Sequence, residues 1–319
     1  MKILITGYAG FVGCHLLNIF ASLEDVNLLG RSQPEKCNQY LRSSIDSSSD
    51  YSAVLAQVKT VIHIAARVHV MNDELDDPLE EFRAVNTAGT MNLARQAAEA
   101  GVKRFIFVSS IKVNGESTTG KQAFTAQDTP SPKDPYGVSK AEAEEQLIAL
   151  GKETGLEIVI IRPPLVYGEG VKANFASLMN LVSKGIPLPF GGITNNKRSL
   201  VSVDNLVDLI VTCIEHPKAA NQVFLVSDDH DVSTSEMVRH MALALDKPTW
   251  QLPLPVWCYN LAGKLFNKSD VVDRLTGSLQ VDITHTKETL GWTPPQSLQE
   301  GFKQTAEAFL QSKKNNGKV

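Results

Sequence analysis

The stretch KILITGYAGFVG, residues 2–13, places a short apolar run directly before a glycine-rich loop and the start of a helical pattern. The apolar run predicts a buried strand, and the residues after the loop predict a helix. Gly7, Gly10 and Gly13 let the backbone approach a pyrophosphate closely, and the helix N-terminus adds free N–H donors and a positive dipole end. A tight turn is the simpler explanation of such glycines, but their place between a strand and a helix favours a nucleotide-binding loop.

The same alternation of short apolar runs and longer helical patterns continues through the first half of the chain. Strands are predicted at 2–6, 26–29, 60–64, 104–109 and 157–162, and helices at 11–22, 78–100 and 136–154. Strands that alternate with helices form parallel βαβ units. The pattern therefore predicts an α/β fold with a Rossmann-type, doubly wound parallel sheet.

Beyond Arg162 this regular alternation ends, because prolines and glycines cluster between Pro163 and Gly192. A strand and helix return at 199–214, a strand follows at 222–226, and the chain is mostly helical from Ser233 onward. We therefore expect a smaller, interleaved C-terminal substrate lobe. In residue numbers, the expected Rossmann domain is 1–165 plus about 199–227, and the expected lobe is about 166–198 and 228–319.

Composition limits the classes of partner. The 319 residues are 43% hydrophobic and 21% charged, as in ordinary globular enzymes. The formal net charge of −4 provides no strong attraction to nucleic acid or anionic lipid, so an anionic ligand must be held locally. The four cysteines form no C-x-x-C pair, which argues against zinc binding and a disulfide-rich scaffold and favours a cytoplasmic location. No run approaches the roughly 18 apolar residues of a membrane span.

The end of the second strand bears on the choice of dinucleotide. A carboxylate at this position would bond the ribose hydroxyls of NAD, but the chain has Gly30-Arg31-Ser32 instead. An arginine can neutralise a 2′-phosphate, so Arg31 favours NADP over NAD. The alternative is a solvated arginine at a strand end.

Tyr136 and Lys140 are four residues apart at the start of a predicted helix, where they share one face. Lowering the pKa of a phenol from about 10 by about 3 units takes about 4 kcal/mol of preferential phenolate stabilisation. A nearby ammonium and a cationic nicotinamide ring supply charge of the right sign. Ser109 and Ser110 close the strand before this helix, at the edge where such sheets bind ligands, and a hydroxyl there can share a proton with Tyr136. An exposed helix pair and a strand-end turn are the simpler explanations.

These residues belong to a series of motifs that resembles the extended short-chain dehydrogenase/reductases, specifically the NAD-dependent epimerase/dehydratase group acting on nucleotide sugars. The resemblance covers nearly the whole chain. The motifs are Thr6–Gly13, His63–Ala66, Val85–Thr90, Val108–Ser110, Tyr136–Lys140, Arg162–Gly168 and Leu290–Pro294.

The resemblance implies roles for the reacting groups and the cofactor site. Tyr136 is implied to be the catalytic base and acid, Ser110 to share its proton, and Lys140 to bind the nicotinamide ribose and lower the tyrosine pKa. Many members have an aspartate before the adenine-flanking aliphatic residue, whereas this chain has Ser44. The residues implied to hold the cofactor are Gly7, Gly10, Phe11, Val12, Gly13, Arg31, Ile45, Ala65, Ala66, Asn86, Ser109, Tyr136, Lys140, Pro163 and Val166.

For the substrate, the resemblance implies that Arg198 and Asn174 bind the diphosphate, with Arg274 as a second arginine and Ser110 beside the sugar. Arg198 has the alternative of a surface pair with Asp204. Two further residues keep two interpretations each. Lys112 either reaches the substrate or points to solvent, and His69 either faces the sugar or is structural. No metal site is expected.

The implied activity is a UDP-sugar 4-epimerase, acting on UDP-glucose or UDP-N-acetylglucosamine by transient C4 oxidation with bound NAD or NADP. A 4-keto nucleotide-sugar reductase or dehydrogenase is the alternative, and Arg31 favours it. A dinucleotide-sensing protein without catalysis is a third possibility. The expected partners are a UDP-sugar and a second copy of the chain, through the helices at 78–100 and 136–154, with no nucleic acid and no membrane insertion.

Overall fold

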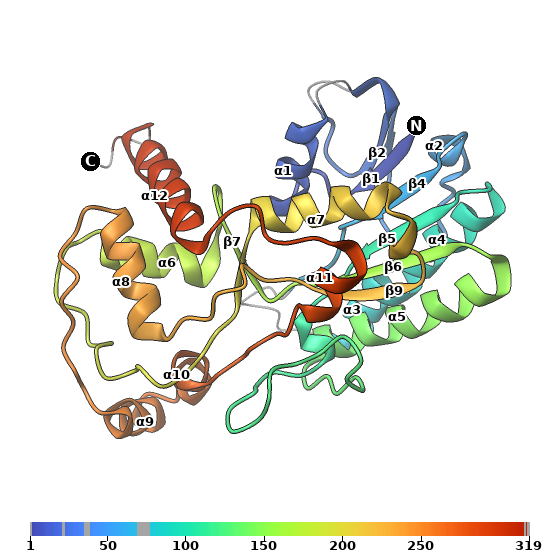
Figure 1. The fold of residues 1–319 in the computed structure, drawn as a ribbon. Helices are drawn as coiled ribbons and strands as arrows, with labels where there is room; N and C mark the ends of the chain where they lie inside the picture. Colours follow the sequence, from blue (N-terminus) through green and yellow to red (C-terminus); the bar gives the residue numbers. More distant parts are fainter. Residues whose placement is uncertain (1, 21–22, 35–38, 69–76, 316, 318–319) are drawn as a thin grey trace.

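A seven-stranded parallel sheet forms the centre of the larger part of the protein. The computed structural model describes residues 2–20, 23–34, 39–68, 77–315 and 317 (Figure 1). The sheet order is β3-β2-β1-β4-β5-β6-β9. Its strands are β1 (Ile3–Thr6), β2 (Val26–Gly30), β3 (Gln39–Arg42), β4 (Thr60–His63), β5 (Arg104–Val108), β6 (Glu157–Arg162) and β9 (Gln222–Leu225). The Rossmann-type fold predicted from the alternating pattern is confirmed.

Helices cover both faces of this sheet. Leu16 of α1 and Leu209 of α7 belong to the core on one face, whereas Leu93 of α4 and Leu147 of α5 belong to the core on the other. The helices of this part are α1 (Phe11–Ile19), α2 (Ser52–Leu55), α3 (Pro78–Phe82), α4 (Thr90–Glu99), α5 (Pro135–Thr154), α7 (Val203–Glu215) and α11 (Thr284–Leu290), with a π-helix at Arg83–Gly89 and 3₁₀ turns at Leu23–Asp25, Ile111–Val113 and Pro217–Ala219.

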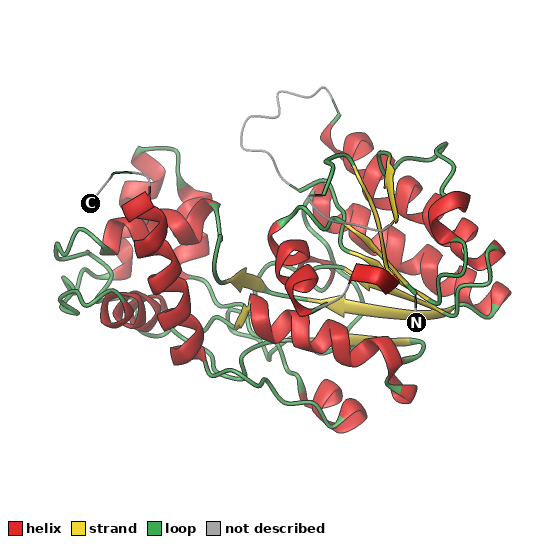
Figure 2. Cartoon of the chain, turned by 90° about the horizontal axis from the view of Figure 1, so that it is seen from above, coloured by secondary structure: helices red, strands yellow, loops and turns green. Residues whose placement is uncertain are grey.

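The remaining elements form a helical lobe beside the sheet (Figure 2). They are a parallel pair of strands, β7 (Leu165–Tyr167) and β8 (Leu200–Ser202), and the helices α6 (Ala173–Val182), α8 (Thr234–Ala244), α9 (Val256–Leu265), α10 (Ser269–Thr276) and α12 (Leu298–Asn315). Tyr167, Phe175 and Phe302 stack at the centre of the lobe's own core. The chain leaves the sheet after β6 and returns to it in β9, so the lobe is interleaved with the sheet.

Two elements differ from the sequence prediction. The pattern over 78–100 predicts one helix, but the structure has α3, the π-helix and α4 in succession. The strand β3 was not predicted, because its side chains are only partly buried and show no clear apolar alternation. Among the described residues, no helix is both long and apolar enough to cross a membrane.

Candidate active site

The glycine loop is packed so closely that side chains would not fit. Gly7 has φ +73°, and a Cβ there would lie 2.6 Å from the backbone nitrogen of Ala65, directly after β4. A Cβ on Gly13 would collide with the carbonyl oxygen of Gly7. The Gly10 N–H donates a hydrogen bond to the same oxygen at 2.9 Å. No side chain caps α1, whose first residues are Phe11 and Val12. Its first N–H groups are therefore directed at the loop, as an anionic pyrophosphate requires.

A buried histidine braces the strands that carry this loop. His63 Nδ1 lies 2.7 Å from the Thr6 hydroxyl, and Nε2 lies 2.9 Å from the Thr90 hydroxyl of α4. The Thr6 hydroxyl also accepts from the Ala65 N–H at 3.2 Å. Burial, reinforced by the charge of Lys140, lowers the pKa of His63 to about 3, so the ring is neutral at physiological pH. The sequence contained His63 within a motif, but its bracing role was missed.

The residues expected near the adenosine lie at the end of β2 and beyond β3. Arg31 is exposed directly after β2, a suitable position for a side chain that meets a ribose phosphate. Ile45 is buried against Gly89, where a Cβ would lie 2.9 Å from the Ile45 backbone. The carbonyl of Ser44 accepts the Tyr51 hydroxyl at 2.9 Å, so this residue contributes its backbone to the local structure.

The π-helix places Asn86 between the loop after β4 and the start of α5. The Asn86 side chain accepts from the Arg67 N–H at 2.8 Å and donates to the Arg67 carbonyl at 3.0 Å. It also donates to the Ser139 hydroxyl of α5 at 3.1 Å. Ala65 and Ala66 are half-buried in the loop that Asn86 fixes. The widened π turn therefore connects the expected cofactor region to the helix of Tyr136.

Lys140 is fully buried beside the end of β5. Its ammonium donates to the carbonyl of Val108 at 2.8 Å and lies 3.8 Å from the centroid of the Phe107 ring. Burial lowers the pKa of Lys140 to about 7, and the nearby Glu144 carboxylate opposes that shift. The lysine is therefore directed at the strand end that bears Ser109 and Ser110.

Tyr136 lies in the first turn of α5, with its ring edge-on to Phe82 at 5.9 Å between centroids. Burial, together with the charge of Asp134, raises the pKa of Tyr136 to about 12. The Ser110 hydroxyl accepts from the Lys112 N–H at 3.2 Å, and among the described residues no hydrogen bond joins Tyr136 to Ser110 or Lys140. In this arrangement the phenol keeps its proton, and a positive charge brought beside it would lower its pKa.

Asp134 is the N-cap residue of α5 and also forms an ion pair with Lys112. Its carboxylate accepts from the Gly137 N–H at 2.7 Å as the helix N-cap, and it forms an ion pair with Lys112, which also lies 3.6 Å from Glu116. Lys112 thus interacts with two carboxylates of the protein. Only contact with the substrate or exposure to solvent was expected from the sequence. The sequence signal for the cap was the aspartate directly before Pro135, because proline is favoured in the first turn of a helix.

Arg198 and Arg274 meet in the lobe. Arg198 Nη1 donates to the carbonyls of Arg274 and Gly277, at 3.0 and 3.3 Å. Burial, with the repulsion of Arg274, lowers the pKa of Arg198. The alternative pairing with Asp204 is wrong, because that carboxylate lies 3.7 Å from His15 instead. The two arginines are thus near enough for their charges to repel, and guanidinium groups are frequent ligands of phosphate.

Pro163 and Val166 follow β6, and the buried Pro163 accepts the Ile111 N–H at 3.0 Å, beside Ser110. Val166 is half-buried in β7. Two expected residues lie outside what the structure describes: His69 belongs to residues 69–76, and the side chain of Asn174, in the first turn of α6, is not described.

A sequence model described as the NAD dependent epimerase/dehydratase family matches residues 3–227, which contain the glycine loop, Ser110, Tyr136 and Lys140. The chain belongs to this family. This family member is 64% identical over 315 residues to a UDP-glucose 4-epimerase of Vibrio cholerae, with 98% of this chain and 96% of the relative covered. The resemblance drawn from the motifs is confirmed.

Solved structures of the family share the fold. A UDP-glucuronic acid 4-epimerase from Bacillus cereus, in complex with NAD, superimposes with a TM-score of 0.77 at 21% identity, covering 98% of this chain and 99% of the other. A UDP-glucose 4-epimerase from Thermotoga maritima, with UDP-glucose, gives 0.75 at 23% identity, also covering 98% and 99%. At these identities the likeness shows the fold alone.

Behind Ser109, this epimerase/dehydratase family member contains a buried ion pair that the sequence did not reveal. Arg162 of β6 binds Glu144 of α5 through Nη2 at 2.5 Å and through Nε at 3.0 Å. Ser109 donates to the same carboxylate at 2.5 Å, and Arg162 Nη1 donates to Asn114 Oδ1 at 2.9 Å. The available signal was the spacing of Lys140 and Glu144, which places both on one face of α5.

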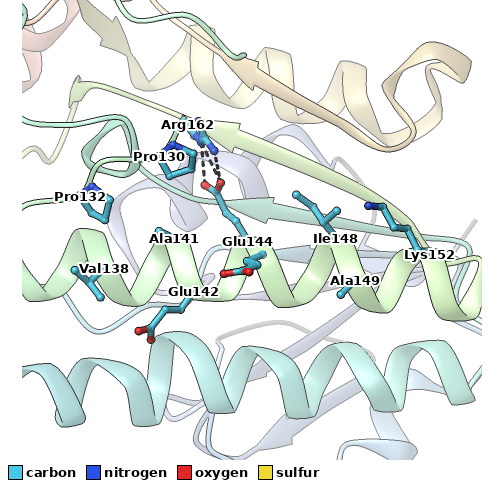
Figure 3. A pocket seen from close by; sticks show the side chains of 11 residues that line it. Pro130, Pro132, Val138, Ala141, Glu142, Glu144, Ile148, Ala149, Lys152 and Arg162 are labelled. Carbon is cyan, nitrogen blue, oxygen red and sulfur yellow. Dashed lines mark hydrogen bonds and ion pairs between the residues drawn. The ribbon is translucent and has the colours of Figure 1, made fainter. Parts of the chain in front are cut away.

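A cavity of about 670 Å³ runs along the outer side of α5 (Figure 3). Val138, Ala141 and Ile148 line it, and Glu144 reaches across it toward Arg162. Its lining includes none of the residues implied in catalysis, so we do not assign it to the reaction.

Proposed function

We propose that this family member is a UDP-sugar 4-epimerase. The observation that carries the proposal is its 64% identity, over nearly the full length of both chains, to a UDP-glucose 4-epimerase. The chain has the serine, tyrosine and lysine that such chemistry needs, at the carboxyl edge of a parallel sheet. Ser110, Tyr136 and Lys140 are the proposed catalytic residues.

The glycine cradle fits a dinucleotide, because Gly7 and Gly13 have no room for side chains and α1 directs free N–H groups at the loop. When bound, NAD or NADP supplies the hydride acceptor and donor. Phe11, Val12, Ala65, Ala66, Pro163 and Val166 would surround the cofactor, Ile45 would flank the adenine, and Asn86 and Ser109 would support the nicotinamide end.

The proton chemistry belongs to Tyr136. We infer that its phenol oxygen takes the proton of the sugar C4 hydroxyl and returns it, with Ser110 sharing that proton. Lys140, whose pKa is near neutrality, holds the ribose and contributes positive charge when protonated. Because the pKa of Tyr136 is about 12 in this arrangement, the base becomes effective only as positive charge gathers beside it.

The substrate diphosphate is proposed to bind Arg198 and Arg274, with Asn174 as a further contact. The charges of the two arginines lie near enough to repel each other, in a chain whose net charge is −4. The lobe, proposed as about 166–198 and 228–319, would thus hold the substrate, while 1–165 with about 199–227 holds the cofactor.

The deciding experiment incubates the purified protein with UDP-glucose or UDP-N-acetylglucosamine, without added cofactor, and measures formation of the 4-epimer. We expect turnover from the wild type and none from Tyr136→Phe, whose dinucleotide binding should stay within a fewfold. Wild-type rates in Tyr136→Phe would contradict the role of the phenol. No epimer, but consumption of NADPH with a 4-keto nucleotide sugar, would assign the chain as a reductase.

We infer a preference for NADP from Arg31, which is exposed at the end of β2 where a carboxylate would select NAD. Arg31→Ala should weaken NADP binding about tenfold, because one charge-assisted contact with the 2′-phosphate is lost. NAD binding should stay nearly unchanged. Isothermal titration of both dinucleotides checks this. Equal losses for the two would remove the preference.

We further propose a homodimer through α3, α4 and α5, in the cytoplasm as the cysteine pattern favours. The exposed Ile148 and the apolar residues along the outer side of α5 support this contact. Sedimentation equilibrium should give twice the chain mass of 34.8 kDa, and a monomer would exclude the dimer.

A further inference from the structure

The helix α9 lies at the outer end of the lobe (Figure 1), and apolar side chains in this helix and just before it are exposed. We define the outer apolar face by Trp250, Leu252, Leu254, Trp257, Leu261 and Leu265. Their exposed fractions run from 40% at Leu254 to 77% at Leu265. These six and Val256, seven of the fifteen large hydrophobic side chains that are exposed in the described part of the chain, thus fall within sixteen consecutive residues. Single exposed hydrophobics need no explanation, but such a concentration marks an interaction surface.

The first half of this face is an extended segment anchored by its backbone. The Leu252 N–H donates to the Leu188 carbonyl at 2.9 Å, and the Leu252 carbonyl accepts the Gly191 N–H at 3.0 Å. Between the outward apolar residues, the Gln251 side chain turns inward and donates to the Ser235 carbonyl at 2.9 Å. The exposed apolar residues are therefore presented on a backbone that these hydrogen bonds fix to the lobe.

The second half is a stripe along α9. Trp257, Leu261 and Leu265 are spaced four residues apart, so they share one side of the helix. The other side packs inward, since Gly263 is buried where a Cβ would lie 2.7 Å from Val272 of α10. The helix thus packs against the lobe through its other side, and its apolar stripe stays exposed to solvent.

The charge of this segment has one sign. Residues 247–269 contain Lys247, Lys264 and Lys268 and no aspartate or glutamate, although the whole chain has a net charge of −4. Each of these three lysines is exposed. Tryptophan and leucine beside lysine on a solvent-exposed helix is the composition of segments that lie in the interface of an anionic membrane.

We propose that the outer apolar face rests on the surface of a bilayer containing anionic phospholipid, with the leucines and tryptophans at the acyl boundary and the lysines at the headgroup phosphates. The protein would lie on the membrane and not cross it. A second copy of the chain is a poorer occupant, because a two-fold contact would bring the lysines of both copies together.

The contact has a geometric consequence for the candidate site. The helix α10 packs on α9 and carries Arg274, whose carbonyl is bonded by Arg198. The helix of the proposed membrane surface therefore packs against the helix that carries Arg274 of the proposed diphosphate site. The proposal itself does not depend on the epimerase activity.

The test measures binding of the full chain to vesicles of phosphatidylglycerol and phosphatidylcholine, by flotation and by tryptophan fluorescence. Two of the three tryptophans are on this face, while Trp292 is 5% exposed and bonded to Asp208. We expect co-flotation and a blue shift with the anionic vesicles, and binding at least tenfold weaker with pure phosphatidylcholine.

The variants separate the face from the rest of the protein. Trp257→Ser/Leu261→Ser and Lys264→Ser/Lys268→Ser should each bind the anionic vesicles at least tenfold more weakly, while Ile19→Ser, an exposed apolar residue of α1, should bind as the wild type. Far-UV circular dichroism and the thermal unfolding midpoint should be the same in all, which verifies folding independently of turnover. The proposal would be overturned if the protein did not bind vesicles, or if it bound neutral vesicles equally well. It would also be overturned if the protein did not bind vesicles and Trp257→Ser/Leu261→Ser converted a dimer to a monomer.

Discussion

At the scale of single residues, the pKa values of Tyr136 and Lys140 are both shifted away from their ordinary values. Burial and Asp134 raise the pKa of the phenol to about 12, and burial lowers the pKa of the lysine to about 7. Both shifts disfavour the charged form of each group, because a dry site solvates neither phenolate nor ammonium well. Tyr136 is therefore neutral at physiological pH, whereas Lys140 titrates near neutrality and can gain or lose its charge there.

Asp134→Asn tests this balance. The amide oxygen can still cap α5 at Gly137, but the negative charge that helps raise the pKa of Tyr136 is removed. The pKa of Tyr136 should fall, so the acid limb of the kcat/KM profile should move to lower pH, by about half a unit or more. Asp50→Asn, at an exposed turn before α2, is the matched control and should leave the limb in place. An unmoved limb in Asp134→Asn would contradict the electrostatic account.

At the scale of elements, α5 is fixed to β6 by the ion pair of Glu144 and Arg162, both at most 4% exposed. Glu144→Gln leaves a buried guanidinium without its counter-charge and should cost about 3–5 kcal/mol in the free energy of unfolding. Glu144→Leu/Arg162→Met removes both charges and should cost markedly less. Urea denaturation of both variants measures the difference. Equal losses would mean that packing, and not the unpaired charge, accounts for the effect.

At the scale of the whole molecule, the net charge of −4 offers no general attraction to a diphosphate, and the proposed recognition therefore rests locally on Arg198 and Arg274. UDP at about 100 times its dissociation constant should stabilise the protein by about 2.7 kcal/mol, which raises Tm by roughly 4 °C. Arg198→Ala should abolish most of that rise, whereas Lys197→Ala, its exposed neighbour, should retain it. Differential scanning calorimetry makes the comparison, and an unchanged rise in Arg198→Ala would remove the arginine from the site.

The fold was predictable because buried parallel strands leave continuous apolar runs, such as those at 104–109 and 157–162. The π-helix was not, because it depends on a backbone hydrogen-bond register that side-chain periodicity does not encode. At the site, the loop and the Tyr136–Lys140 pair are local patterns. Glu144 with Arg162, and His63 with Thr90, are partners from distant segments that meet only in the folded chain.

The late return of the chain to the sheet affects the order in which the protein can fold during synthesis. β6 pairs with β9, and β9 follows the first part of the lobe, β7, α6 and β8, in sequence. Until Gln222–Leu225 leaves the ribosome, the edge of β6 at residues 159–162 has unpaired backbone groups and apolar side chains. Such an edge can recruit a strand from another nascent chain. A fragment that stops near residue 165 would therefore contain the strands β1 to β6 but lack β9. We expect such a fragment to aggregate.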